Sequence, residues 1–182
     1  MNVKNYQYKG KQELVYTNNS SDTLKKVYYH LFNNAFQPGS EMDARLQTIK
    51  DPDARMVNKA KESRIKTLKP NEIGFLNVSN FKQDGAVAIA KTVGTILEVT
   101  LAKPILPNSK TTFTLDFDGQ VPVQIRRSGR NNTEGIELSM AQWYPKIAEF
   151  DFEGWHADPY IAREFHGVWG NFDLKITIDK EY

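Results

Sequence analysis

The sequence predicts a mainly β protein, an antiparallel β-sandwich or saddle-like pair of sheets with a short helical insertion. Three observations predict this fold class. Apolar and polar residues alternate with a period of two through most of the second half, as from Phe113 to Phe117. Turn signals such as Asp84-Gly85 separate the short apolar runs, and helical spacing is confined to residues about 40–68. Clean alternation indicates antiparallel sheets with one face in water.

The N-terminal part predicts three strands. Gly10 lies between a Tyr-rich segment, Val3 to Tyr8, and a second segment, Gln12 to Thr17, as in a hairpin. A polar loop follows at residues 18–22, and Leu24 to Phe32 is a further strand candidate with aromatic side chains on both faces.

The helical insertion is predicted from two capping signals. Ser40 is a candidate N-cap with Asp43 at the third position, and Met42, Leu46 and Ile49 follow at helical spacing. Asp51-Pro52 is the signal for a second helix, with proline at the first helical position. Its looser apolar stripe ends before Pro70 and consists of Ala54, Val57, Ile65 and Leu68. The charged run from Lys59 to Lys66 is then the exposed face of that helix.

The remaining strands are predicted from alternation and turns. Asp84-Gly85 is a hairpin turn signal, and an apolar run of small residues follows from Ala86 to Ala90. Alternation then marks strands at Leu97 to Leu101, at Phe113 to Phe117 and at Leu174 to Ile178. Strands of this number and length suit a sandwich or a curved pair of sheets.

Composition limits the possible functions. The 182 residues fit one domain, 1–182, and 24 basic against 22 acidic side chains give a formal charge of +2, too balanced to favour nucleic acid or an anionic membrane. The absence of cysteine excludes thiol nucleophiles, disulfides and Cys-type zinc sites. No apolar run is long enough for a membrane helix, and we see no signal peptide. Both ends look cut from something longer.

Two groups of charged residues are candidates for chemistry. His156 and His166 lie among carboxylates and together form a zinc-like ligand set, but their spacing matches no HExxH motif, so we expect no metal site and no catalytic residue here. The neighbouring carboxylates are Asp151, Glu153, Asp158 and Glu164. Pairs two apart, such as Asp116 and Asp118, share the solvated face of a strand more often than they form an acid and base pair.

The arginines at positions 126, 127 and 130 form the second group. They lie in a loop, and such a cluster either clamps a carboxylate or phosphate, or forms a solvated turn or an inter-domain salt bridge.

Aromatic side chains concentrate between Met140 and Phe172. This stretch holds Trp143, Trp155 and Trp169, and rings of this size mark either a core or an interface. Glycines stand beside Trp155 and Trp169, where the backbone can approach another surface closely. We therefore predict that part of the stretch packs against a neighbouring domain and is exposed without it.

Two runs of sequence resemble a known family. They are YYHLFNNAFQPGSEMDAR (Tyr28 to Arg45) and the longer run from Gln124 to Asp179, which contains QWYPKIAEFDFEGWHADPY. These runs resemble the N-terminal β-saddle domain of aminopeptidase-N-like gluzincin zinc metallopeptidases, and most closely a branch of Bacteroidota-type bacteria. The resemblance implies a non-catalytic domain that packs on a downstream catalytic domain and shapes the substrate cleft. The zinc, with the HExxH motif, belongs to that catalytic domain, and this chain needs no cofactor of its own.

The resemblance also implies site residues. The family's Gln-aromatic-Glu-Pro segment matches Gln142, Trp143, Tyr144 and Pro145, so Gln142 and Tyr144 are expected to contact a peptide substrate in the full-length protein. Tyr144 replaces the acidic anchor for the substrate's free amine, which puts aminopeptidase specificity in question. Trp143, Trp155, Trp169 and Arg127 are the expected inter-domain interface. The family places the domain in the periplasm or cell envelope. The alternative from the residues alone is a free-standing carbohydrate- or peptide-binding module.

Overall fold

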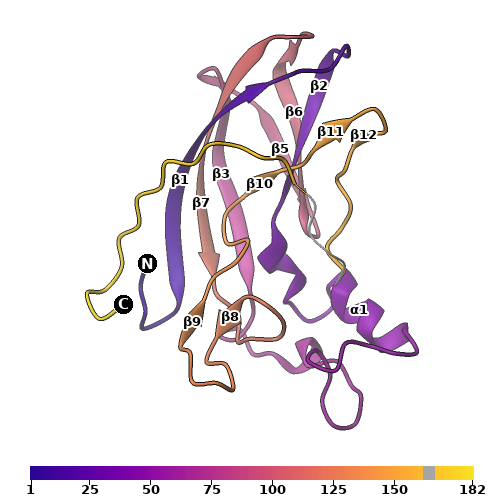
Figure 1. Cartoon of the computed structure of the whole chain (residues 1–182), viewed down its shortest axis with the longest axis vertical. Coiled ribbons are helices and arrows are strands. Elements are labelled where there is room, and N and C mark those ends of the chain that lie inside the picture. Colours follow the sequence, from indigo (N-terminus) through magenta and orange to yellow (C-terminus); the bar gives the residue numbers. More distant parts are fainter. Residues whose placement is uncertain (162–166) are drawn as a thin grey trace.

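The computed structural model describes residues 1–161 and 167–182, and it shows two four-stranded antiparallel sheets packed together (Figure 1). The fold class is therefore as the sequence predicts. The first sheet has the order β1-β7-β3-β4, formed by β1 (Gln7–Thr17), β7 (Lys110–Gln120), β3 (Phe75–Gln83) and β4 (Ala86–Val87). The second has the order β10-β2-β6-β5, formed by β10 (Lys146–Ile147), β2 (Leu24–His30), β6 (Ile96–Ile105) and β5 (Ile89–Val93).

Shorter elements surround the two sheets. Two small ladders are formed by β8 (Gly129–Arg130) with β9 (Leu138–Ser139), and by β11 (Phe150–Asp151) with β12 (Gly154–Trp155). The helical elements are η1 (Phe32–Ala35), α1 (Glu41–Thr48) and η2 (Ile65–Thr67). None of the helices in the described part of the chain is long and apolar enough to cross a membrane.

The main core lies between the sheets, where aromatic rings join one sheet to the other. Tyr29 of β2 is fully buried and meets Phe81 of β3 and Phe113 of β7 edge-on, with ring centres 5.6 and 6.4 Å apart. Burial alternates along β7, with Phe113, Leu115 and Phe117 inside. The predicted alternation of β6 and β7 is thus confirmed, because each alternate side chain points into the space between the sheets.

The first predicted helix is confirmed as α1. The Ser40 hydroxyl oxygen accepts a hydrogen bond from the Asp43 backbone N–H at 3.1 Å, which satisfies one of the unpaired donors at the helix start. Met42 and Leu46 point inward and are buried in a second, smaller cluster beside the sheets. Tyr160 joins this cluster, and its backbone N–H donates to the Thr95 hydroxyl at 2.8 Å.

The second predicted helix is wrong. Residues 52–64 form turns, with an isolated bridge between Val57 and Ser63, and only η2 is helical. The Asn58 side-chain oxygen accepts from the backbone N–H groups of Ala60 and Glu62, both at 2.9 Å. Such local bonds compete with a helix, so the exposed lysines of this segment belong to a loop.

The predicted hairpin at Gly10 is also wrong, because β1 runs through this residue without a break. Its register against β7 is continuous from Gln7 opposite Gln120 to Thr17 opposite Lys110. A Cβ atom at Gly10 would overlap the ring of Phe117, its partner on β7. The glycine makes room for an aromatic ring and does not mark a turn. By contrast, Asp84 and Gly85 form the predicted hairpin turn between β3 and β4, with φ angles of 48° and 84°.

The predicted C-terminal strand is absent from the described structure. Residues 171–182 run back alongside β1 toward the N-terminus (Figure 1), and none of them joins a sheet. Leu174 and Ile176 are 64% and 61% exposed. Apolar and polar residues do alternate here, but in the described structure no strand pairs its backbone with this segment.

Candidate functional site

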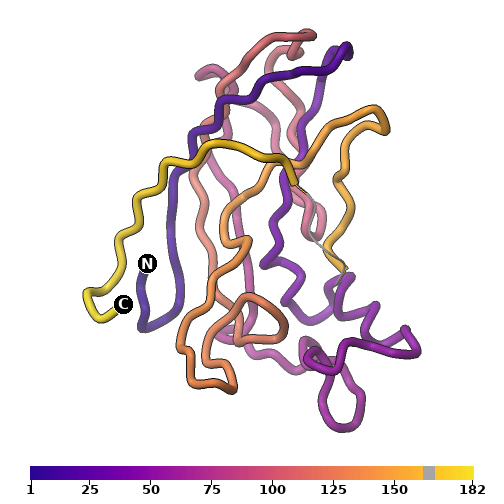
Figure 2. The backbone as a smooth tube through the Cα atoms, in the orientation of Figure 1, coloured from indigo at the N-terminus to yellow at the C-terminus, as the bar shows by residue number. Residues whose placement is uncertain are grey.

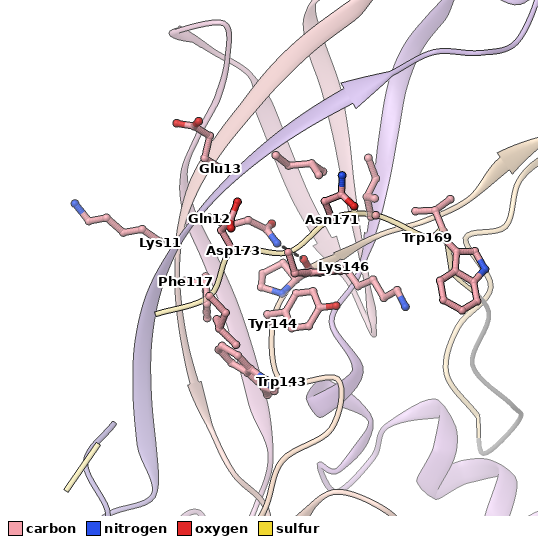
Figure 3. Close-up of a pocket in the computed structure, with 17 residues that line it drawn as sticks. Lys11, Gln12, Glu13, Phe117, Trp143, Tyr144, Lys146, Trp169, Asn171 and Asp173 are labelled. Carbon is pink, nitrogen blue, oxygen red and sulfur yellow. Dashed lines mark hydrogen bonds between the residues drawn. The ribbon is translucent and has the colours of Figure 1, made fainter. Parts of the chain in front are cut away.

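An open aromatic cavity is the candidate functional site. Its volume is about 270 Å³, and it lies between β1, the segment 143–147 and the segment 168–174 (Figure 3). Apolar side chains form most of its wall, and charged and amide side chains surround them. The lining includes Lys11, Gln12, Glu13, Leu14, Phe117, Trp143, Tyr144, Pro145, Lys146, Trp169, Asn171, Phe172 and Asp173.

Buried hydrogen bonds fix the part of the cavity that carries Trp143. The Asn33 side-chain amide donates to the Tyr8 hydroxyl at 3.0 Å, and that hydroxyl donates to the Trp143 backbone carbonyl at 2.7 Å. Burial raises the pKa of Tyr8 far above its ordinary value, so the hydroxyl keeps its proton for this bond. The Trp143 ring centre lies 6.1 Å from that of Phe117. The cavity wall is thus held by the core of the sandwich.

Tyr144 and Gln142 do not face the same space. Tyr144 lines the aromatic cavity half-buried, with its ring edge-on to Trp143 and to Phe172 at 5.5 and 6.1 Å. Partial burial raises the pKa of the Tyr144 phenol, so it is neutral near pH 7. Gln142 has a left-handed backbone, with φ at 51°, and lines a separate small gap beside Arg127 and Tyr160. Tyr144 and Gln142, the two residues predicted to contact a substrate, therefore line two separate cavities.

The three tryptophans occupy different environments. Trp143 and Trp155 are half-buried and pack on the main core, and the Trp155 ring centre lies 5.8 Å from that of Tyr28. Trp169 is fully exposed. Phe172, Leu174 and Ile176 follow it along the chain and are also exposed. The exposed apolar side chains are therefore centred on residues 169–176, C-terminal to most of the predicted interface.

Arg126 and Arg130 of the arginine cluster contact other residues of the chain. Arg126 donates to the Tyr160 hydroxyl at 2.8 Å, and its Nε lies 3.7 Å from an Asp53 carboxylate oxygen. Arg130 is buried, with its guanidinium carbon 4.3 Å from the centre of the Tyr6 ring. Arg127 is the exposed member, and it lies beside Gln142. Arg126 and Arg130 therefore pair within the chain, which neither of the two alternatives drawn from the sequence predicted.

Asp151, Glu153 and His156 come together at the hairpin of β11 and β12. Ligand atoms of the three side chains lie within 4.8 Å of one another, and His156 Nε2 is 2.8 Å from an Asp151 carboxylate oxygen. This hydrogen bond raises the pKa of His156 above its ordinary value of 6.5. The sequence analysis placed these residues in one zinc-like ligand set without expecting a metal site, and the hairpin brings the three side chains together. His166 and Glu164 lie outside the described residues.

Sequence reasoning missed the contribution of β1 and the C-terminal segment to the cavity. Lys11 to Leu14 and residues 168–174 both line it. Two signals pointed to the second segment: Trp169 with its flanking glycines, which predicts an interface, and the alternation that begins at Leu174, which predicts a strand. Exposed apolar residues in an alternating segment indicate a surface that lacks a neighbour.

A comparison of the chain with models of known protein families, with curated proteins and with solved structures gives no match. What the chain does must therefore be inferred from its own residues and their geometry.

Proposed function

We propose that this chain is the non-catalytic N-terminal domain of an aminopeptidase-N-like zinc metallopeptidase, in which it packs on the catalytic domain and shapes the substrate cleft. The catalytic groups and the zinc would belong to the downstream domain, and the chain would need no cofactor. The family's location in the periplasm or cell envelope is part of the same proposal.

One observation carries the proposal. The two sequence runs that resemble the family meet in space, because Asn33 of the first run and Trp143 of the second are joined through the Tyr8 hydroxyl. Asn34, next in the first run, accepts a hydrogen bond from the backbone N–H of Leu76 at 2.7 Å. The resembling residues thus form one rigid support that presents Tyr144 at an open aromatic cavity. Rigid support of a binding loop is what a cleft-shaping domain requires.

The expected roles follow from exposure. Tyr144 would line the first substrate pocket, with Gln142 supporting the same loop from its other side. Trp169 and Arg127, both exposed, would contact the catalytic domain, and so would the outer edges of Trp143 and Trp155. A neutral phenol binds an ammonium group less tightly than a carboxylate does, so substrates without a free amino terminus would be accepted as well.

The test is to express the chain joined to the polypeptide encoded after Tyr182, and to assay zinc-dependent hydrolysis of free and N-blocked peptides. We expect an HExxH motif in that polypeptide and peptidase activity from the joined protein. Tyr144→Phe should lower kcat/KM by up to about tenfold. Tyr144→Glu should favour free amino termini, and Val15→Thr, on the exposed side of β1, is the matched control that should change neither value. A downstream sequence without zinc ligands would refute the proposal.

A free-standing binding module for carbohydrate or peptide is the second candidate, and the cavity itself favours it. The aromatic rings of Trp143, Tyr144 and Phe172 stand beside the polar side chains of Gln12 and Asn171, a combination common in ligand sites. Binding of an oligosaccharide or peptide to the isolated chain, lost in Tyr144→Ala, would support this function. Failure of the isolated chain to bind, together with activity of the joined protein, would support the first.

A further inference from the structure

The outer edge of β1 is open over most of its length. β1 pairs with β7 along one edge, and within residues 1–161 and 167–182 no strand pairs with its other edge. The Gln7 carbonyl points to this open side, since it accepts a hydrogen bond from the Asn2 N–H at 2.8 Å. Backbone groups alternate in direction along an antiparallel strand, so those of Lys9, Lys11 and Glu13 point to the same side as those of Gln7.

Two residues of the chain already lie where a neighbouring strand would run. Asn2 forms an antiparallel bridge with Gln7, and the Met1 amino group donates to the Thr177 carbonyl at 2.7 Å. Met1 and Asn2 therefore lie between β1 and the C-terminal segment, bonded to both. Figure 2 shows the two ends of the chain side by side at this point. Met1 and Asn2 thus occupy the start of a strand position along the outer edge of β1, and no strand of the described residues occupies the rest.

Beyond Met1 the strand position continues as the aromatic cavity. Lys11 to Leu14 line it together with residues 168–174, and Phe117 contributes an apolar side chain. Figure 3 shows Asp173 of the second segment beside Gln12. Gly10 carries no side chain, and the Phe117 ring fills that place. Leu174, which also lines the cavity, and Ile176 are both more than half exposed.

We propose that this open edge of β1, beside the aromatic cavity, accepts one extended segment of a partner polypeptide as a β-strand antiparallel to β1. The segment would bond to the outward backbone groups of Lys9, Lys11 and Glu13. Its alternate side chains, opposite Gly10, Gln12 and Leu14, would be apolar and would enter the cavity. The side chains between them would be polar, with acidic residues favoured opposite Lys9 and Lys11. This proposal does not depend on the peptidase assignment.

The strand and Tyr144 use different parts of the cavity. The strand would lie on the side of Lys11 and Gln12, whereas the Tyr144 hydroxyl points toward the side of Lys146 and Trp169 (Figure 3). A seated strand therefore leaves the phenol accessible.

The test uses a tethered probe, because a free hexapeptide binds weakly and tethering supplies a high effective concentration. The extension Val-Thr-Val-Thr-Val-Thr is joined to Met1, which continues the bridge register so that the three valines lie opposite Gly10, Gln12 and Leu14. The control is Thr-Val-Thr-Val-Thr-Val, which has the same composition but turns the valines to the solvent face. Amide hydrogen exchange is measured by NMR for Lys9, Lys11 and Glu13.

We expect the first extension to slow exchange of these three amides by about tenfold or more, and the control extension to leave them close to their rates in the unextended chain. Equal protection by both extensions, or protection by neither, would overturn the proposal. The unextended chain is also measured at rising concentration. If its own β1 amides become protected as the concentration rises, a second copy supplies the strand, and the assignment to a different partner is overturned.

Discussion

β7 and the segment from Leu174 to Ile178 have the same alternating pattern but opposite environments. In β7 the apolar residues Phe113, Leu115 and Phe117 are buried, and the strand is paired on both edges. In the C-terminal segment Leu174 and Ile176 are more than half exposed, and the segment joins no sheet. An alternating pattern therefore shows only which side chains a segment is able to bury. Whether it does so depends on a neighbouring strand.

We expect the largest difference in stability between β7 and the C-terminal segment when one matched apolar side chain of each is truncated. Phe113→Ala should lower the free energy of unfolding by about 3–5 kcal/mol, because it leaves a cavity between the sheets. Ile176→Ala should change it by less than about 0.5 kcal/mol. Urea denaturation followed by circular dichroism gives both values. A cost for Ile176→Ala similar to that for Phe113→Ala would mean that the C-terminal segment is packed after all.

The same comparison can be made with glycines. Gly10→Ala places a methyl group against the Phe117 ring and should cost about 1–3 kcal/mol of stability, since the ring must leave its site. Gly170→Ala, in the C-terminal segment, meets only the edge of Phe172 at 4.0 Å and should be nearly neutral. Thermal unfolding of the two variants measures the difference. A neutral Gly10→Ala would show that β1 and β7 are not in this register.

Paired asparagines extend the comparison to buried polar groups. Asn33→Ala removes the donor to the Tyr8 hydroxyl and should cost about 1–2 kcal/mol, with loosening of Trp143 visible as a change in its fluorescence. Asn171→Ala is its exposed counterpart and should have an effect within about 0.5 kcal/mol. Unchanged fluorescence in Asn33→Ala would disprove the support that we assign to this hydrogen-bonded chain.

The smallest effect is expected at the hairpin of β11 and β12, outside both regions. Asp151 raises the pKa of His156 in the folded chain above 6.5. The protonated pair therefore adds stability that is complete below pH 6.5 and is lost as the pH rises through the folded pKa. Asp151→Asn should lower the pKa of His156 toward 6.5 in an NMR titration. Glu153→Gln, which removes a weaker influence, should lower it less. The reverse order would mean that Asp151 is not the main partner.

Much of the sandwich was predictable because its signals are local. The turn at Asp84-Gly85, the cap at Ser40 and the alternation of β7 each depend on residues close in sequence, and each is confirmed. Gly10 was misread because its role depends on Phe117, a residue far away in the sequence. Pro52 was misread because the loop bonds of Asn58 outweigh a loose apolar stripe.

The site was less predictable than the fold. Tyr144 was singled out by resemblance, and the structure places it at the cavity but places Gln142 elsewhere. Two further lining segments, Lys11 to Leu14 and residues 168–174, come from the two ends of the chain. No spacing rule brings such distant segments together, so only the fold reveals that they line one cavity.

Amide hydrogen exchange of the unmodified chain distinguishes an alternating segment that is paired in a sheet from one that is not. Exchange is followed residue by residue, by NMR, in β7 and in the segment from Leu174 to Ile178. We predict that amides of β7 exchange only through unfolding of the sandwich, whereas those of Leu174 to Ile178 exchange within about tenfold of the free-peptide rate. Protection of the C-terminal amides equal to that of β7 would contradict the account.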